Sequence, residues 1–237
     1  PGSNMSTHAK LSPSSATRWL TCPGSVQLID DLDEQGLLAD DENVYAAEGT
    51  AAHAFAAAVL EKQIEPAMLL LMAPTIYNWN FAMIPHIKTY AEHVRALVKL
   101  DEELLIEARV EFDQWVPSGM GTTDAAVLDF DRRTVHVIDF KYGRMRVDAH
   151  ENPQLKLYAA GILQKYESAF DRFALTIVQP RCKSISTFEL SREELERWLS
   201  DVVSPAARLA LSADAPLVPS VEACRWCRAR ALCKARL

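Results

Sequence analysis

Residues 134–143 read Thr-Val-His-Val-Ile-Asp-Phe-Lys-Tyr-Gly, and the rest of the chain is interpreted around them. The first half of this stretch is apolar and β-branched, a pattern typical of a buried strand. Because successive strand side chains point to opposite faces, we predict that Asp139 and Lys141 share one face and Phe140 occupies the other. Burying a carboxylate and an ammonium is costly unless they are paired or functional. The pattern therefore predicts a strand-end ion pair or a metal site with a positioned water.

Length and composition restrict the class of protein. The 237 residues are 49% hydrophobic and 24% charged, which is typical of a globular protein with one or two domains. No apolar run approaches the roughly 20 residues that span a bilayer, and the N-terminus does not resemble a signal peptide. We therefore expect a cytoplasmic protein that binds no membrane, with residues 1–4 a remnant of cloning and residues 5–237 a single domain.

The net charge of −7 argues against nucleic-acid binding through bulk charge. It is compatible with a local basic groove, because metal-binding carboxylates count as negative until the ion is bound. Basic residues that follow predicted strands, together with the arginines of the tail, are candidates for phosphate contacts, with a solvated surface as the alternative. They are Arg144, Arg146, Arg181, Lys183, Arg225, Arg228, Arg230 and Arg236. Three aromatic residues offer rings for stacking on bases, although internal packing is favoured for the two tryptophans: Trp19, Trp226 and Tyr142.

The hydrophobic pattern predicts four more strands and five helices. Three strands are expected to form a meander, and two more follow it: residues 104–115, 120–130 and 134–140, then 173–179 and 184–190. In the first strand, alternation places four apolar residues on one face and Glu107 on the other: Ile106, Ala108, Val110 and Phe112. Helices are expected at residues 12–22, 45–62, 85–103, 151–166 and 191–211, the last capped by Ser191 and Glu194. The connecting segments are expected to be an acidic loop, a short helix with a loop, and a linker: 28–44, 68–83 and 213–219.

Two carboxylates and one imidazole are candidates for a metal site. Asp124 and Asp139 lie near the ends of adjacent predicted strands and can share one divalent cation, with Lys141 beside it. A hard cation such as Mg²⁺ accepts carboxylate oxygens, and His53 as a third ligand would favour Mn²⁺. Such an ion polarises a phosphate and lowers the pKa of a bound water, while Lys141 would orient that water or neutralise developing charge. A purely structural His53 is the alternative.

The five cysteines suggest a second metal centre. The tail contains Cys224, Cys227 and Cys233 in a C-x2-C-x5-C pattern, an incomplete ligand set for zinc or for an iron–sulfur cluster. Either Cys22 or Cys182 would complete it, and Cys22 is favoured because it ends a predicted helix beside a proline. A shared site would join the two ends of the chain and stabilise it by closing a long loop. Unligated cysteines are the remaining alternative.

Five motifs in order carry a family resemblance. They are Glu48-Gly49-Thr50-x2-His53, Gly121-Thr122-Thr123-Asp124, Asp139-Phe140-Lys141, Gln154-x3-Tyr158, and an early Cys-Pro with the late cysteine pattern. Together they resemble the RecB-like branch of the PD-(D/E)xK nuclease superfamily. Within it, the chain is similar to the iron–sulfur exonucleases, namely the AddB nuclease domain and CRISPR-associated RecB-like exonucleases, and most like stand-alone forms carried by phages and prophages. Thr123 stands where the family pattern often has proline, and no G-x4-GK[ST] motif for an ATP-driven motor is present.

The resemblance implies a restriction-endonuclease-like fold, in which a mixed central sheet is flanked by helices and the N- and C-terminal segments are joined by an iron–sulfur cluster. The nuclease core would span about residues 45–190, with cluster-binding segments at 12–23 and 222–237. It implies a Mg²⁺ or Mn²⁺ ion on His53, Asp124, Asp139 and the Phe140 carbonyl, with Lys141 catalytic alongside the two aspartates. Gln154 and Tyr158 would contact DNA. It also implies a [4Fe-4S] cluster on four cysteines: Cys22, Cys224, Cys227 and Cys233.

The expected function is therefore metal-dependent DNA exonuclease activity. The expected substrates are single-stranded DNA or DNA ends in phage recombination or replication, inside a bacterial host cell. A single-strand annealing recombinase is the expected partner, by analogy. Two alternatives remain: a structure-specific endonuclease, or an iron–sulfur module that binds DNA ends with little hydrolysis.

Overall fold

A five-stranded mixed sheet forms the centre of the computed structural model, which describes residues 9–38, 44–68, 80–99 and 102–236. The strands lie in sequential order: β1 (Glu103–Glu111), β2 (Met120–Asp129), β3 (Thr134–Phe140), β4 (Arg172–Gln179) and β5 (Ser184–Ser191). Neighbouring strands are antiparallel except β3 and β4, which are parallel. The predicted meander and the mixed α/β class are confirmed.

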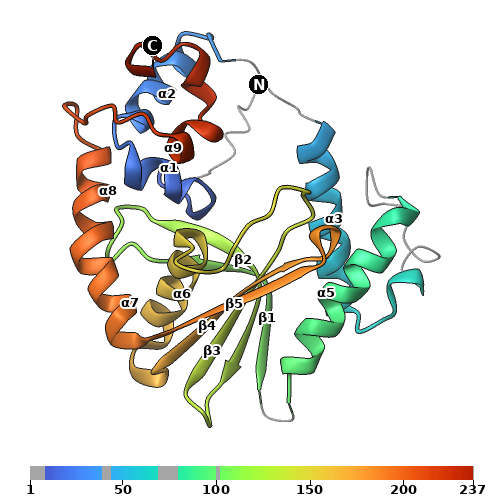
Figure 1. The fold of residues 1–237 in the computed structure, drawn as a ribbon. Helices are drawn as coiled ribbons and strands as arrows, with labels where there is room; N and C mark the ends of the chain where they lie inside the picture. The colour runs from blue at the N-terminus through green and yellow to red at the C-terminus, as the bar shows by residue number, and fades with distance from the viewer. Residues whose placement is uncertain (1–8, 39–43, 69–79, 100–101, 237) are drawn as a thin grey trace, which may run out of the picture.

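Helices cover both faces of the sheet. Helix α6 (Pro153–Tyr166) lies on one side, and α3 (Val44–Glu61) and α5 (Ile84–Leu97) lie on the other (Figure 1). A parallel strand pair needs a crossover, and α6 supplies it between β3 and β4. Asn152 begins this helix by accepting the N–H groups of Gln154 and Leu155, with Pro153 at the first helical position. The helix that follows the quoted strand is thereby fixed in place.

The small residues of α3 allow it to lie close to the sheet, as expected. Ala51, Ala52 and Ala56 are buried and pack in one apolar cluster with Val127 of β2 and Phe140 of β3. On the other face, the α6 side chains pack against Val135, Val137 and other residues of the sheet. Each core therefore holds alternate residues of β3, so that one face of the strand end points toward α3 and α5 and the other toward α6.

The expected alternation along β1 is wrong beyond Ile106. Ile106 packs against the α3 and α5 side, whereas Val110 belongs to the α6 side, although strand residues four apart should share a face. Glu107 lies between them with φ +44°, in the left-handed region that a glutamate rarely adopts. This inversion shifts the alternation by one residue and places Glu107 on the same side as Ile106.

Three other boundaries differ from expectation. Residues 25–34 form helix α2 rather than part of a loop, because Ile29 and Leu32 are three apart and pack against Ala229 of the tail. Helix α5 ends at Leu97 rather than near residue 103.

The helix after Ser191 has the predicted capping box but is split into α7 (Arg192–Trp198), a π-helical turn (Leu199–Val203) and α8 (Ser204–Ala210). Proline at 205 has no N–H to continue the α-helical ladder, and the interruption immediately precedes it. Most of the expected short helix and loop at 68–83 lies outside the described residues.

The two ends of the chain pack together. Helix α1 (Ala16–Thr21) contacts α9 (Val221–Arg225), and the N-terminal helices and the tail form one group beside the sheet (Figure 1). Gly24 donates its N–H to Pro216 O at 2.9 Å. A Cβ on Gly24 would lie 2.4 Å from Ala215 O, so only glycine permits this approach. The expected linker is therefore bound to the N-terminal segment and takes no helical or strand form in the described chain.

No helix within the described ranges is both long and apolar enough to cross a membrane.

We predict opposite effects of alanine at two helical glycines. A Cβ on Gly161 of α6 would lie 2.6 Å from Val110 Cβ, whereas a Cβ on Gly49 of α3 would have nothing within 4 Å. Gly161→Ala should therefore lower the free energy of unfolding by about 1–3 kcal/mol through overpacking. Gly49→Ala should raise it by about 0.5–1 kcal/mol, because alanine favours a helix interior. Urea denaturation monitored by circular dichroism measures both, and an unchanged midpoint for Gly161→Ala would contradict the packing of α6 on β1.

Candidate active site

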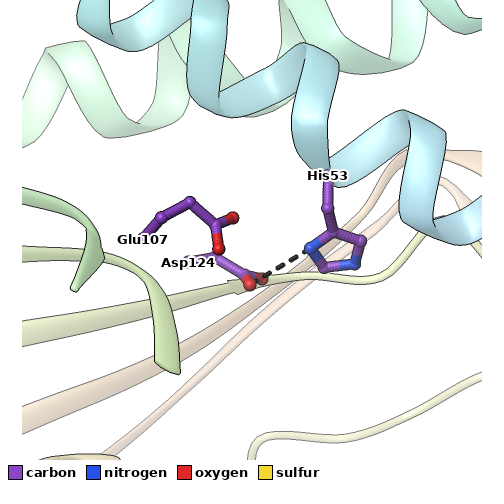
Figure 2. Close-up of side chains that lie close together, drawn as sticks. All are labelled: His53, Glu107 and Asp124. Atoms are coloured by element: carbon purple, nitrogen blue, oxygen red, sulfur yellow. Dashed lines mark hydrogen bonds and ion pairs between the residues drawn. The ribbon is translucent and has the colours of Figure 1, made fainter. Parts of the chain in front are cut away.

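Asp124 occupies the point at which β2 and β3 stop pairing. Their ladder ends with Ala125 opposite Ile138. Asp124 Oδ2 then accepts the backbone N–H of Phe140 at 2.6 Å, and Oδ1 lies 3.1 Å from Nδ1 of His53 on α3 (Figure 2). The carboxylate therefore takes the place of the next rung of the ladder and joins the sheet to α3. The predicted proximity of His53 and Asp124 is confirmed.

The second part of the site continues along β3 to α6. Lys141 Nζ lies 3.0 Å from Asp139 Oδ2 and donates to Gln154 Oε1 at 3.0 Å. Gln154 Nε2 donates in turn to the hydroxyl of Tyr158 at 2.9 Å. Asp139 and Lys141 share the face that looks toward α6, as predicted. Phe140 is fully buried on the other face, with its ring 5.5 Å from that of His53.

Glu107 also belongs to the site, although the alternation along the first predicted strand only put it on the face opposite the apolar residues and indicated no function for it. The ligand atoms of His53, Glu107 and Asp124 all lie within 4.8 Å of one another (Figure 2). The β1–β2 register pairs Ile106 with Ala125 on one side of this position, which sets Glu107 opposite Asp124. Counting residues outward from the turn between the first two predicted strands could have indicated that Glu107 and Asp124 pair. The sequence gives no sign of the left-handed φ that turns the Glu107 side chain toward α3.

The electrostatics of the site show how closely its charges are gathered. Burial lowers the pKa of His53, but the hydrogen bond to Asp124 and the charges of Asp124 and Asp139 outweigh it, so the pKa is raised. Burial and the charge of Asp124 raise the pKa of Glu107. Burial also raises the pKa of Asp139, and the opposing effect of Lys141 does not reverse this. Burial lowers the pKa of Lys141, but the charge and hydrogen bond of Asp139 and the charge of Asp124 together outweigh it, so the pKa is raised and the amine remains an ammonium at neutral pH.

These residues fit a divalent cation. The imidazole of His53 converges with the carboxylates of Glu107 and Asp124, whereas the Asp139 carboxylate is paired with Lys141 and lies outside this group of three. Two carboxylates at this spacing repel one another unless a cation lies between them. The hydroxyl of Tyr90 is buried and has no hydrogen-bond partner among the described residues. Burial and then the carboxylates of Asp124, Asp139 and Glu107 raise its pKa, and its ring lies 4.8 Å from the ring of Phe140. Oxygen ligands with one imidazole suit Mn²⁺ and Mg²⁺.

Three of the basic residues predicted to follow strands, but not Lys183, line a groove that adjoins Lys141. Arg144 and Arg146 are exposed on the loop after β3 and line one groove together with Lys141. Arg181 lines the same groove; its guanidinium is 3.0 Å from Glu48 Oε2 and stacks over the Tyr142 ring at 4.6 Å. Lys183 is exposed in the turn between β4 and β5 and is not part of the groove lining.

The cysteine of the N-terminal segment and the three cysteines of the tail are not part of the group formed by His53, Glu107 and Asp124. Cys22 ends α1, and its Sγ accepts the backbone N–H of Val218 at 3.2 Å. Cys227 is buried, and the charges of Cys22 and Cys224 both affect its pKa, which burial raises. Within the described ranges, the cysteine sulfurs do not lie as close together as the candidate ligand atoms of His53, Glu107 and Asp124. Cys182 instead contacts Arg144 O at 3.2 Å, beside the loop after β3.

A family model described as "Protein of unknown function (DUF2800)" matches residues 8–237. The chain belongs to the DUF2800 family. A solved structure titled "Crystal structure of SSO0001" is similar to this DUF2800 protein at 18% identity and a TM-score of 0.36, covering 89% of this chain and 95% of that one. A likeness this distant carries no argument about the function of the DUF2800 chain, which therefore has to be inferred from its own residues.

We predict that the metal-free protein is stabilised by Mn²⁺. An ion at about 100 times its Kd adds about 2.7 kcal/mol to the free energy of unfolding. His53→Ala and Asp124→Asn should each remove most of this gain, and Glu107→Gln should weaken it. Thermal unfolding with and without Mn²⁺ measures the effect. Glu92→Gln, at an exposed position on α5, is the matched control and should respond like the unaltered chain. Equal stabilisation of His53→Ala and the control would place the ion elsewhere.

Proposed function

We propose that this protein is a metal-dependent deoxyribonuclease that hydrolyses phosphodiester bonds, and that it acts as an exonuclease on DNA. The observation that supports the proposal best is one continuous arrangement. A His53–Asp124 pair is tied to the backbone of Phe140, and the adjacent Asp139–Lys141 pair is tied to Gln154 and Tyr158. Its residue types and order agree with the nuclease motifs that the sequence resembles.

The acidic end of the arrangement would hold the ion. His53, Asp124, Asp139 and the Phe140 carbonyl are the ligands implied by the resemblance, and Glu107 adds a carboxylate within 4.8 Å of the first two. A Mg²⁺ or Mn²⁺ ion bound there supplies Lewis-acid polarisation of the phosphate and lowers the pKa of a water. In the reaction, the water oxygen would form a new bond to phosphorus and release a proton to solvent, the bond to the leaving oxygen would break, and that oxygen would take up a proton from solvent.

Lys141 would act as a fixed cation. Its ammonium is held between the Asp139 carboxylate and the Gln154 amide oxygen, which limits it to one position beside the phosphate. A positive charge that is already in place stabilises the charge that develops in the transition state without further rearrangement. The hydroxyl of Tyr158 orients Gln154, so Tyr158 acts through Gln154. Gln154 is partly exposed beside Lys141 and can contact the DNA backbone, whereas Tyr158 is buried and would serve to orient Gln154.

The surrounding fold is proposed to be restriction-endonuclease-like, since the carboxylates come from the ends of adjacent strands of a mixed sheet and the histidine from a covering helix. The biological setting, which is the processing of DNA ends in phage recombination or replication together with a single-strand annealing protein, rests on the sequence resemblance alone.

A [4Fe-4S] cluster on Cys22, Cys224, Cys227 and Cys233 is proposed as the second metal centre. The packing of α1 on α9 and of α2 on the tail favours it, because the segment that carries Cys22 then lies against the segment that carries the other three cysteines. The contact of Cys182 with the loop after β3 argues for Cys22 as the fourth ligand. Each thiolate of a cubane binds a different iron, so the sulfurs need not converge as they would around one zinc ion.

We predict that Lys141→Ala and Asp124→Asn each reduce cleavage of end-labelled linear DNA by about 10²–10³-fold in Mg²⁺ or Mn²⁺, the usual cost of losing one transition-state contact. Lys165→Ala, at an exposed lysine on α6, is the matched control and should cleave normally. Single-stranded and duplex substrates are compared, and a covalently closed circle tests for endonuclease activity. Undiminished cleavage by Lys141→Ala would refute the assigned site, and cleavage of the circle would favour the endonuclease alternative.

A brown protein that contains iron and sulfide is expected from purification without air. Cys22→Ala and Cys233→Ala should lose the visible absorbance, because each removes one of four ligands. Cys182→Ala should keep it, since this cysteine lies at another loop. Metal analysis and visible spectroscopy provide the measurement. A colourless protein with one equivalent of zinc would replace the cluster by a structural zinc site.

A further inference from the structure

A large groove adjoins Lys141 on the side away from the acidic group. It has a volume of ≈ 1180 Å³, and three segments that are distant in sequence form its walls: residues 14–18, 143–148 and 222–226. Small-molecule sites enclose about 300–1,000 Å³, so this groove exceeds the usual size for a compact ligand. It leads from the candidate active site to the helices that carry the cysteines.

The groove is basic in a chain whose net charge is −7. Three acidic and six basic side chains line it. The basic ones are Arg18, Lys141, Arg144, Arg146, Arg181 and Arg225. One of the acidic residues, Glu48, already forms an ion pair with Arg181. Because the basic residues come from every wall of the groove, their arrangement suits an extended polyanion better than a single phosphate group.

One wall is held rigidly by Gln179, a residue with no predicted role. Its side chain is fully buried at the end of β4. It donates to the backbone oxygens of Gly143 and Met145 at 2.8 and 2.7 Å and accepts the N–H of Val147 at 3.0 Å. These bonds fix the loop that carries Arg144 and Arg146, so a ligand need not order that loop when it binds.

The wall formed by the tail presents an exposed indole. Trp226 follows α9 and is 73% exposed, although it lies between Cys224 and Cys227, where packing was the favoured expectation. The neighbouring Arg225 contacts Met145 Sδ at 3.7 Å, so the tail wall meets the loop wall at this point. A large exposed aromatic ring beside basic side chains is the combination with which proteins hold unpaired bases.

We infer that this groove binds an unpaired nucleic-acid strand, with Trp226 stacking on a base and Arg144, Arg146 and Arg225 contacting phosphates. An unpaired strand fits because stacking requires a free base face, which a duplex does not offer along its length. The inference rests on the proposed function for the reaction at Lys141, but it concerns binding and assigns Trp226 to specificity rather than to chemistry.

Fluorescence anisotropy of a labelled oligothymidine with EDTA present tests the inference, because it measures binding without cleavage. Trp226→Ala should weaken binding about 10-fold, equal to ~1.4 kcal/mol, while Trp226→Phe should retain most of the affinity. Arg144→Ala combined with Arg146→Ala should also lower the slope of log affinity against log salt by about 0.7 per lost phosphate contact. Leu232→Ala in the same tail and Arg208→Ala on α8 are matched exposed controls outside the groove and should bind normally.

An oligonucleotide with abasic sites separates stacking from a structural effect. Removing bases should weaken binding to the unaltered protein and have little further effect on Trp226→Ala, since both changes delete the same contact. Additive losses, or normal binding by Trp226→Ala, would overturn the inference. Binding with this signature but no cleavage in Mg²⁺ or Mn²⁺ would refute the nuclease proposal and leave the groove assignment intact. Cleavage of DNA combined with normal binding by the groove variants would refute the groove assignment and leave the nuclease proposal intact.

Discussion

The structure of the candidate site depends on the Asp124 carboxylate, which stands in for a rung of the β2–β3 ladder. One of its oxygens accepts the Phe140 N–H at 2.6 Å and the other meets His53 at 3.1 Å. Hydrogen bonds to a charged group contribute about 1.5–3 kcal/mol and favour short, fixed geometries. A single side chain thereby sets the spacing of α3 from the sheet and holds the backbone of the residue between Asp139 and Lys141.

The site extends across the sheet because of this contact. Phe140 is packed on the α3 and α5 side, so its two neighbours in the chain, Asp139 and Lys141, face α6, where Gln154 meets Lys141. Acidic groups from β1, β2 and β3 are brought together, and burial together with mutual repulsion raises the pKa of Glu107 and Asp139. The left-handed backbone of Glu107 is a strained conformation within this site, and such conformations persist where the surrounding structure fixes them.

The terminal segments add a second layer of organisation. Gly24 and Cys22 bond to residues 216 and 218, which places the tail next to the loop after β3. That loop is held by Gln179, and Arg225 reaches across to Met145. The cysteine-bearing segments therefore form one wall of the groove that adjoins Lys141, so their packing bears on what the groove can bind as well as on stability.

The sequence by itself determined the five strands, most helices, the shared face of Asp139 and Lys141, and the grouping of His53 with Asp124, because these follow from local periodicity and from motifs whose order is written in the chain. Only the tertiary structure decided the rest. Glu107 enters the site through one inverted φ angle that no periodicity encodes, and residues 25–34 become helical because the distant tail covers their apolar side. Trp226 and Gln179 acquire roles only where segments far apart in sequence meet, since packing between such segments depends on the whole fold rather than on any local pattern.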